Sequence, residues 1–318
     1  MAIDVIVHDR RFLDLFDPNQ DYVRIASGLT LGEGPVWHEG LRSLIFNDIP
    51  ASKTYMYNER DGLRLLFDNG SKANGMWVDP EGWLLVCEHA TSRLVRRSID
   101  GRTVEVLADH FGDIELNSPN DVVQRSDGLI YFSDPIYGRL DKPACVPRPF
   151  PSELRPVYLY DPRTKKLSLA ATGFENPNGL CFSPDEKALY VNDSPSYRIL
   201  AFDVEVDGRL THERLVAKTQ GEGGPPDGMK VDEFGNIVCA AQQGLHWLTP
   251  AGKYLGVIIE PERLLNLTWG DDDFQTLYIA CATGAYRFRT RVRGCRYGRG
   301  APQGAGRPRS TRKEQHHE

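Results

Sequence analysis

The sequence has no long hydrophobic run. No stretch approaches the roughly 18 consecutive apolar residues that a membrane-spanning helix needs. Residues 1–11 alternate polar and apolar side chains and lack the apolar segment of a secretory leader. We therefore expect a cytoplasmic protein that has no membrane partner.

Cysteine is scarce, and positive charge is not in excess. The chain has six cysteines and no Cys-x-x-Cys pair, which argues against a zinc–cysteine site and against a disulfide framework. Cys87, Cys181, Cys239 and Cys281 lie in short apolar segments, where they are expected to act as small buried hydrophobes. The formal net charge of −6 argues against nucleic acid as a partner.

The chain is rich in turn residues, with 30 glycines and 21 prolines, and these punctuate a repeat. Each copy has a polar residue, a short apolar strand, a turn and a second apolar strand. The polar residue is often followed by glycine. Six such polar residues, here called the anchors, begin the copies: Glu33, Asn74, Asn120, Asn178, Asp227 and Asn266.

Successive anchors lie 39–58 residues apart. Copies of roughly this length are typical of propeller blades with four short strands. One copy alone would leave an apolar sheet face uncovered, so the copies must pack side by side. The sequence thus predicts an all-β fold, a six-bladed β-propeller with four-stranded antiparallel blades, over residues 1–294. The alternative is a β-sandwich of unrelated hairpins, which the recurrence of the polar residue disfavours.

Three segments lie outside the repeat. Residues 22–26 form a strand without a partner of its own, which we expect to complete the blade that begins at Asn266 and so to close the ring. Residues 139–156 interrupt the third copy and contain five prolines, so we expect an extended loop over the channel mouth. Residues 295–318 are expected to be a disordered basic tail, and a candidate non-native extension.

The anchors indicate a metal site. The first strand of each blade lines the channel of a propeller, so the six anchors would converge there as two carboxylates and four amides. Acids gathered in a channel are costly to bury unless a cation joins them. Ca²⁺ suits oxygen ligands best, while Zn²⁺, Mn²⁺ and Fe²⁺ stay open. The alternative is that these residues only form turns, but Glu33 is not a turn former.

Several motifs in this order resemble the SMP-30/gluconolactonase/luciferin-regenerating-enzyme family over residues 31–293. They are Glu-Gly-Pro-Val-Trp at 33–37, Pro-Asn-Asp at 119–121, Asp-Pro-x-Tyr-Gly at 134–138, Pro-Asn-Gly-Leu at 177–180 and Pro-Asp-Gly-Met at 226–229. Cys87-Glu88-His89 and Arg93 resemble the bacterial gluconolactonase branch.

The resemblance implies a divalent-metal-dependent hydrolase that opens a small, sugar-type lactone. It implies Glu33, Asn178 and Asp227 as metal ligands, and Asn120 as a fourth ligand or a substrate contact. One departure matters: Ser118 stands where the animal members have arginine. Their contacts to sugar hydroxyls therefore do not transfer to this chain.

Candidate catalytic residues are Asp227, with the metal, and His89 and Asp134. His89 and Asp134 end second strands on the metal face, where they are better placed to move a proton than a metal-bound carboxylate. Candidate substrate contacts are Asn74, Asn120, His89 and Tyr137. The structural alternatives are a hydrogen-bonded wall residue for His89 and a turn cap for Asp134.

Two other functions stay open. An aryl-ester or organophosphate esterase could use the same metal site, since a metal that stabilises an oxyanion serves either reaction. A non-catalytic interaction propeller is disfavoured, because it has no reason to gather acids in its channel. The sequence determines neither the lactone nor the oligomeric state.

Overall fold

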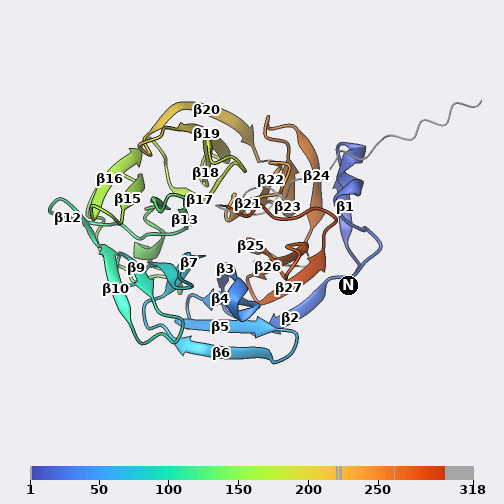
Figure 1. Cartoon of the computed structure of the whole chain (residues 1–318), viewed down its shortest axis with the longest axis horizontal. Coiled ribbons are helices and arrows are strands. Elements are labelled where there is room, and N and C mark those ends of the chain that lie inside the picture. Colours follow the sequence, from blue (N-terminus) through green and yellow to red (C-terminus); the bar gives the residue numbers. More distant parts are fainter. Residues whose placement is uncertain (1, 220, 222–223, 261, 298–318) are drawn as a thin grey trace, which may run out of the picture.

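The computed structural model describes residues 2–219, 221, 224–260 and 262–297. It confirms the six-bladed β-propeller: six antiparallel sheets stand around a central axis (Figure 1). In each blade the first strand, which begins within two residues of an anchor, is innermost (Figure 1). The described residues contain no helix that is long and apolar enough to cross a membrane.

The strands follow the repeat in order. Blade one is formed by β3 (Gly32–His38), β4 (Ser43–Asp48), β5 (Lys53–Asn58) and β6 (Gly62–Asp68). Blade two is formed by β7 (Ala73–Val78), β8 (Leu84–Glu88), β9 (Arg93–Arg97) and β10 (Val104–Ala108). Blade three is formed by β13 (Val122–Gln124), β14 (Ile130–Ser133), β15 (Val157–Asp161) and β16 (Lys166–Ala171). The fourth and fifth blades are formed by β17 (Pro177–Phe182), β18 (Ala188–Asp193), β19 (Arg198–Val204) and β20 (Leu210–Lys218); and by β21 (Met229–Val231), β22 (Ile237–Ala241), β23 (Gly244–Leu248) and β24 (Tyr254–Ile259).

The sixth blade closes the ring as predicted. It contains β25 (Leu264–Gly270), β26 (Thr276–Cys281) and β27 (Gly284–Arg289), and its outer strand is the N-terminal β2 (Val23–Ser27). β2 pairs antiparallel with β27. The sequence analysis missed β1 (Asp4–Val7), which adds a fifth strand to blade five by pairing with β24.

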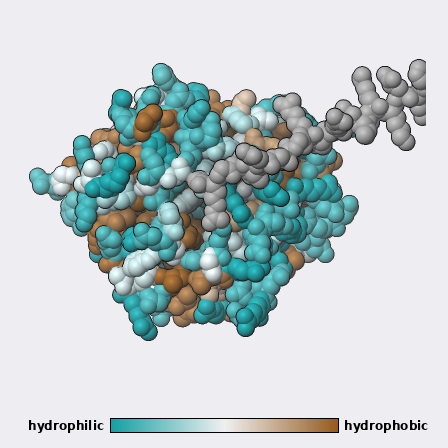
Figure 2. Space-filling model, viewed as in Figure 1, coloured by the Kyte–Doolittle hydropathy of each residue, from teal (hydrophilic) through white to brown (hydrophobic). Residues whose placement is uncertain are grey.

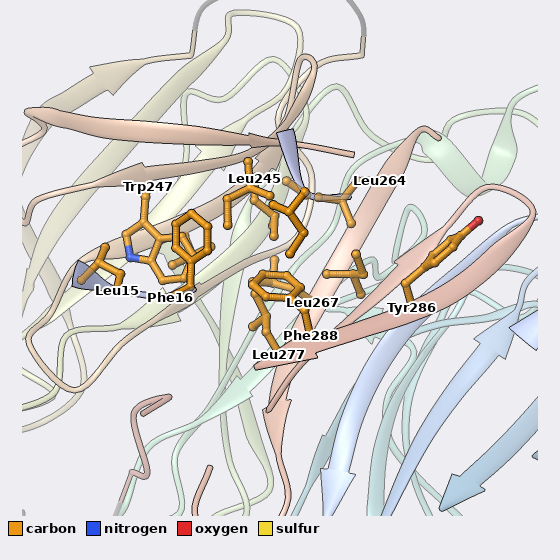
Figure 3. Close-up of a cluster of buried hydrophobic side chains, with 14 of the residues drawn as sticks. Leu15, Phe16, Leu245, Trp247, Leu264, Leu267, Leu277, Tyr286 and Phe288 are labelled. Atoms are coloured by element: carbon orange, nitrogen blue, oxygen red, sulfur yellow. The ribbon is translucent and has the colours of Figure 1, made fainter. Parts of the chain in front are cut away.

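The core lies between neighbouring blades. Each buried cluster draws its residues from two adjacent sheets, so the apolar face of one blade is covered by the next. Figure 3 shows the cluster between blades five and six, where Trp247 faces Leu277 and Phe288. Leu15 and Phe16 join it from the segment after the short helix η1 (Arg10–Asp14). The N-terminal segment therefore contributes core side chains as well as a strand.

The four strand cysteines, Cys87, Cys181, Cys239 and Cys281, are buried and free, as expected of small buried hydrophobes.

The third copy carries the expected insertion between its second and third strands. It begins with the short helix η3 (Tyr137–Arg139) and ends at β15. Two smaller features were not foreseen, a hairpin of β11 (His110–Phe111) and β12 (Ile114–Glu115) and the short helix η2 (Glu39–Leu41). Polar residues dominate the face seen in Figure 2, with apolar patches between them.

The C-terminal segment continues three residues past the expected domain boundary at Gly294. The Cys295 amide donates to the carbonyl of Val231, and the Tyr297 hydroxyl donates to the carbonyl of Phe182 at 2.6 Å. The Tyr297 ring lies against Trp77 and Phe182. These three residues belong to the folded body, and residues 298–318 of the expected tail lie outside the described residues.

Candidate active site

The repeated glycine has a steric cause at the channel. In four blades the residue after the anchor is a glycine that lies against the anchor of the next blade. A Cβ atom would collide there at 2.0–2.5 Å, a separation at which the blades must move apart. The pairs, each a glycine with the anchor it meets, are Gly34 with Asn74, Gly75 with Asn120, Gly179 with Asp227 and Gly228 with Asn266. The motif therefore brings the anchors together.

Hydrogen bonds between blades fix the same ring. In three blades a polar side chain of the second strand donates to the backbone carbonyl of the next blade's anchor. The donors are Asn47 to Asn74 (2.7 Å), Ser133 to Asn178 (2.7 Å) and Asn192 to Asp227. The backbones of these three anchors are therefore held by the neighbouring blade.

Glu33 and Asp227 are within electrostatic reach of each other in this ring. Glu33 is buried and accepts hydrogen bonds at Oε2 from the Gly34 amide (2.8 Å) and Asn266 Nδ2 (3.0 Å). Burial raises the pKa of Glu33 well above its usual range, and the charge of Asp227 raises it further. Enclosure in the channel wall raises the pKa of Asp227 to about 7, although a hydrogen bond from Asn178 opposes this. When both carboxylates are ionised they repel each other, which makes the pair unfavourable.

These residues fit a divalent cation. Among the described residues no group of three or more His, Cys, Asp or Glu side chains is arranged to hold a metal. The anchors instead offer two carboxylates together with the amides of Asn120 and Asn178, which are buried beside them. Oxygen donors of this kind are what Ca²⁺ prefers. A cation between Glu33 and Asp227 would also relieve their repulsion.

Three charged residues near the ring were missed by the sequence analysis. Asp121 is buried, its Oδ2 has no hydrogen-bond partner in the described part of the chain, and its charge raises the pKa of both Glu33 and Asp227. Burial raises the pKa of Asp121, and the charge of Lys230 opposes this rise; the charge of Arg263 likewise opposes the rise in the pKa of Asp227. The channel therefore has basic side chains within electrostatic reach of its acids. Asp121 lies in the Pro-Asn-Asp motif but was given no role, whereas Lys230 and Arg263 lie outside every quoted motif, three residues from an anchor.

Asn74 and His89 form one unit in the wall of the channel. Asn74 Nδ2 lies 3.0 Å from His89 Nε2, and both residues are buried. With the amide in this orientation, Nε2 accepts the bond and the neutral ring carries its proton on Nδ1. Burial lowers the pKa of His89 to about 4, while the Ala144 backbone opposes part of that shift. The ring is a neutral acceptor for Asn74, which agrees with the alternative of a hydrogen-bonded wall residue.

Tyr137 reaches the same end of the channel from η3. Its hydroxyl interacts with Ser194, and the charge of Asp227 contributes to raising its pKa. Burial is the main reason that its pKa is raised, and the residue is only partly exposed. Tyr137 is therefore near the acids with a neutral hydroxyl, as a substrate contact would be.

The contacts of Asp134 are those of a structural residue. Its two carboxylate oxygens accept from the amides of Asn117 and Ser118, each at 2.8 Å, and the side chain is fully buried. Asp48 and Asp193 end the second strands of two other blades and accept backbone amides in the same way. Burial raises the pKa of Asp134 to about 7. The geometry favours loop anchoring by Asp134 over proton transfer.

A cavity of about 700 Å³ lies toward the opposite end of the channel. It is lined by the later residues of the first strands, such as Trp37 and Trp77, and by Tyr297. The anchors are absent from its wall, so this cavity is distinct from the ring of acids.

Comparison with known proteins identifies the family. The model of the SMP-30/gluconolactonase/LRE-like region matches residues 31–283. The chain belongs to this family. A gluconolactonase of Zymomonas mobilis is 30% identical over 295 residues, which cover 85% of this chain and 81% of that protein.

Solved structures of family members agree with the fold. A gluconolactonase from Xanthomonas campestris has a TM-score of 0.84 at 29% identity, over 90% of this chain and 94% of that one. A calcium-binding regucalcin from Agrobacterium tumefaciens has a TM-score of 0.72 at 15% identity, over 87% of this chain and 96% of that one. The second likeness shows the common fold alone.

Proposed function

We propose that the protein is a lactonase that hydrolyses a small, sugar-type lactone with the help of one divalent cation. The observation that carries the proposal is the convergence of Glu33, Asp227 and four amide anchors at one end of the channel, in a chain that belongs to the gluconolactonase family. A non-catalytic platform would not need two acids held against each other.

Glu33, Asn120, Asn178 and Asp227 would hold the cation, with Ca²⁺ the first choice for this donor set and Zn²⁺, Mn²⁺ or Fe²⁺ the alternatives. When bound, the cation supplies Lewis-acid polarisation of the lactone carbonyl. Asp227 is partly exposed to the channel, so its carboxylate would accept a hydrogen bond from the attacking water and orient it.

The remaining residues would bind the substrate. Asn74 and Asn120 would offer amide groups to sugar hydroxyls, and the Tyr137 hydroxyl, which lies beside Ser194 and within electrostatic reach of Asp227, would be a further contact. His89 would act through Asn74, because its Nε2 is already engaged by that amide. Arg263 lies close enough to Asp227 to attract the carboxylate that ring opening releases.

The deciding experiment combines metal content with a substrate panel. Asp227→Ala should lose both the bound metal equivalent and lactone hydrolysis, because it removes one of two anionic ligands. Asp207→Ala, which removes an exposed turn acid, is the matched control and should keep both. The panel contains five- and six-carbon aldonolactones, an aryl ester and an organophosphate triester, followed with a pH indicator.

Full metal content and normal turnover in Asp227→Ala would show that the ligand assignment is wrong. Turnover of the aryl ester or the triester alone would move the function to an esterase on the same site.

A further inference from the structure

The insertion in blade three is fastened to the turn that carries His89. Arg148 Nη2 donates to the backbone carbonyl of His89 at 2.8 Å and to Ser92 Oγ at 2.5 Å, and Nη1 donates to Val146 at 3.0 Å. Arg148 thus links the insertion to both sides of the turn between β8 and β9. A half-buried guanidinium that donates three bonds has a defined position.

A second arginine holds the base of the insertion. Arg139 is buried and donates to the carbonyls of Leu116 and Asn117, to Pro149 in the insertion, and to Ser92 Oγ. Ser92 Oγ in turn donates to the carbonyl of Asn117 at 2.5 Å. The hydroxyl of Ser92 therefore joins the two arginines of the insertion to the wall of blade two.

The insertion also packs directly on the imidazole of His89. A Cβ atom at Gly138 would lie 2.7 Å from His89 Cγ, so any side chain there would displace the ring. The Gly138 carbonyl accepts from Val146, which turns the insertion back over the ring, and the Gly138 amide donates to Ser118 Oγ. On the far side, Lys72 Nζ donates to the carbonyl of Pro143 at 2.9 Å. The insertion therefore extends from blade three to the loop before blade two.

We propose that Arg148 and Gly138 are positioning residues, which hold His89 so that its Nε2 orients the amide of Asn74 toward the substrate. The insertion is then part of the binding apparatus as well as a cover over the mouth. The kinetic part of this inference rests on the proposed lactonase function, whereas the position of the imidazole does not.

The position of His89 can be measured without any activity. In protein labelled with ¹⁵N-histidine, with the ring signals assigned by loss in His89→Gln, the wild type should show one neutral tautomer with the proton on Nδ1. Arg148→Met removes the hydrogen bonds but keeps the length of the side chain, and Gly138→Ala pushes the ring. Both variants should shift the Nε2 signal toward a mixture of tautomers. Arg155→Met lies in the same insertion without touching His89, and it should leave the spectrum unchanged.

A double-mutant cycle tests the link to the substrate. Arg148→Met should lower kcat/KM for the best lactone by about tenfold, or about 1.4 kcal/mol, while the metal content stays at one equivalent. In the His89→Gln background the same change should cost less than about twofold, because the residue that Arg148 positions is gone.

Two results would overturn the inference. One is an unchanged His89 spectrum in both Arg148→Met and Gly138→Ala, measured on folded protein. The other is a full tenfold loss that adds to that of His89→Gln. If no lactone is turned over at all, the proposed function fails while the spectra still decide the role of the two positioning residues.

Discussion

At the scale of the residue, the same chemistry serves different roles according to its neighbours. Glu33 and Asp134 are both buried acids with a raised pKa. Glu33 is within electrostatic reach of a second carboxylate, that of Asp227, whereas Asp134 accepts two backbone amides as Asp48 does. A raised pKa in the channel therefore marks the proposed metal site only where acids meet, and marks a loop anchor elsewhere.

The role of Asp134 can be tested by an isosteric change. Asp134→Asn replaces one acceptor by an NH₂ group that faces a backbone amide, so it should destabilise the fold by about 1–3 kcal/mol. Asp48→Asn should do the same, because its two bonds are equivalent. Urea unfolding measures both losses. We expect each folded variant to keep most of its turnover, and loss of turnover in Asp134→Asn alone would restore Asp134 as a catalytic candidate.

Glu260 gives a prediction for pH. The Tyr22 hydroxyl donates to its Oε1 at 3.0 Å, and burial raises the pKa of Glu260 to about 8 from 4.5. The folded state therefore resists ionisation, and the stability that the neutral carboxyl contributes is lost as the pH rises from about 4.5 to 8.

Glu260→Gln removes this dependence. Its free energy of unfolding, relative to wild type, should rise between pH 5 and pH 8.5 by on the order of 2 kcal/mol, less than the full shift because the residue is partly exposed. Urea unfolding at the two pH values gives the comparison. An equal difference at both would show that Glu260 ionises freely in the folded protein.

At the scale of the element, the N-terminal segment is an integral part of the propeller because it supplies both a strand and core side chains. β2 supplies the fourth strand of blade six, and Phe12 and Phe16 complete the cluster between blades five and six. The chain closes its ring with residues from both ends, so without the first 28 residues blade six lacks its fourth strand and the core between blades five and six lacks Phe12 and Phe16.

Two truncations distinguish the contributions of β1 and β2 to stability. Removing residues 1–28 should destabilise the protein by several kcal/mol, since a paired strand and large buried side chains are lost. Removing residues 1–8 takes away β1, whose side chains are mostly exposed, and should cost much less. Thermal unfolding of both proteins measures this, and equal melting temperatures for the longer truncation and the wild type would refute the closure argument.

At the scale of the whole molecule, the channel has two unlike ends. The ring of acids and amides lies where the first strands begin, and the 700 Å³ cavity lies where they end. The segment that ends at Tyr297 crosses this second end and bridges Trp77 of blade two and Phe182 of blade four. It therefore links two blades that are not neighbours in the ring.

This bridge revises the expectation for the tail. Ending the chain after Tyr297 should leave the free energy of unfolding nearly unchanged. Ending it after Gly294 should cost about 1–3 kcal/mol, because the Tyr297 ring and its hydrogen bond to Phe182 are lost. Calorimetry on the two truncated proteins distinguishes them, and equal stability would mean that residues 295–297 contribute nothing.

The repeat determined the fold at the level of the sequence. Short apolar strands at regular intervals cannot be buried singly, so six copies require a closed ring, and the unpaired strand at residues 22–26 requires the place next to β27. The polar residue at each start indicated which side chains meet in the channel. All of this follows from periodicity, which is a local property.

Only the tertiary structure decided how these side chains are used. The glycines after the anchors are explained only once the next blade is in place, because the nearest atoms that a Cβ would meet belong to residues 38–48 positions away. The hydrogen bond from Arg148 to His89 and the positions of Lys230 and Arg263 near the acids also depend on neighbouring blades. Contacts between distant segments depend on the closed ring, and no pattern within a single blade encodes them.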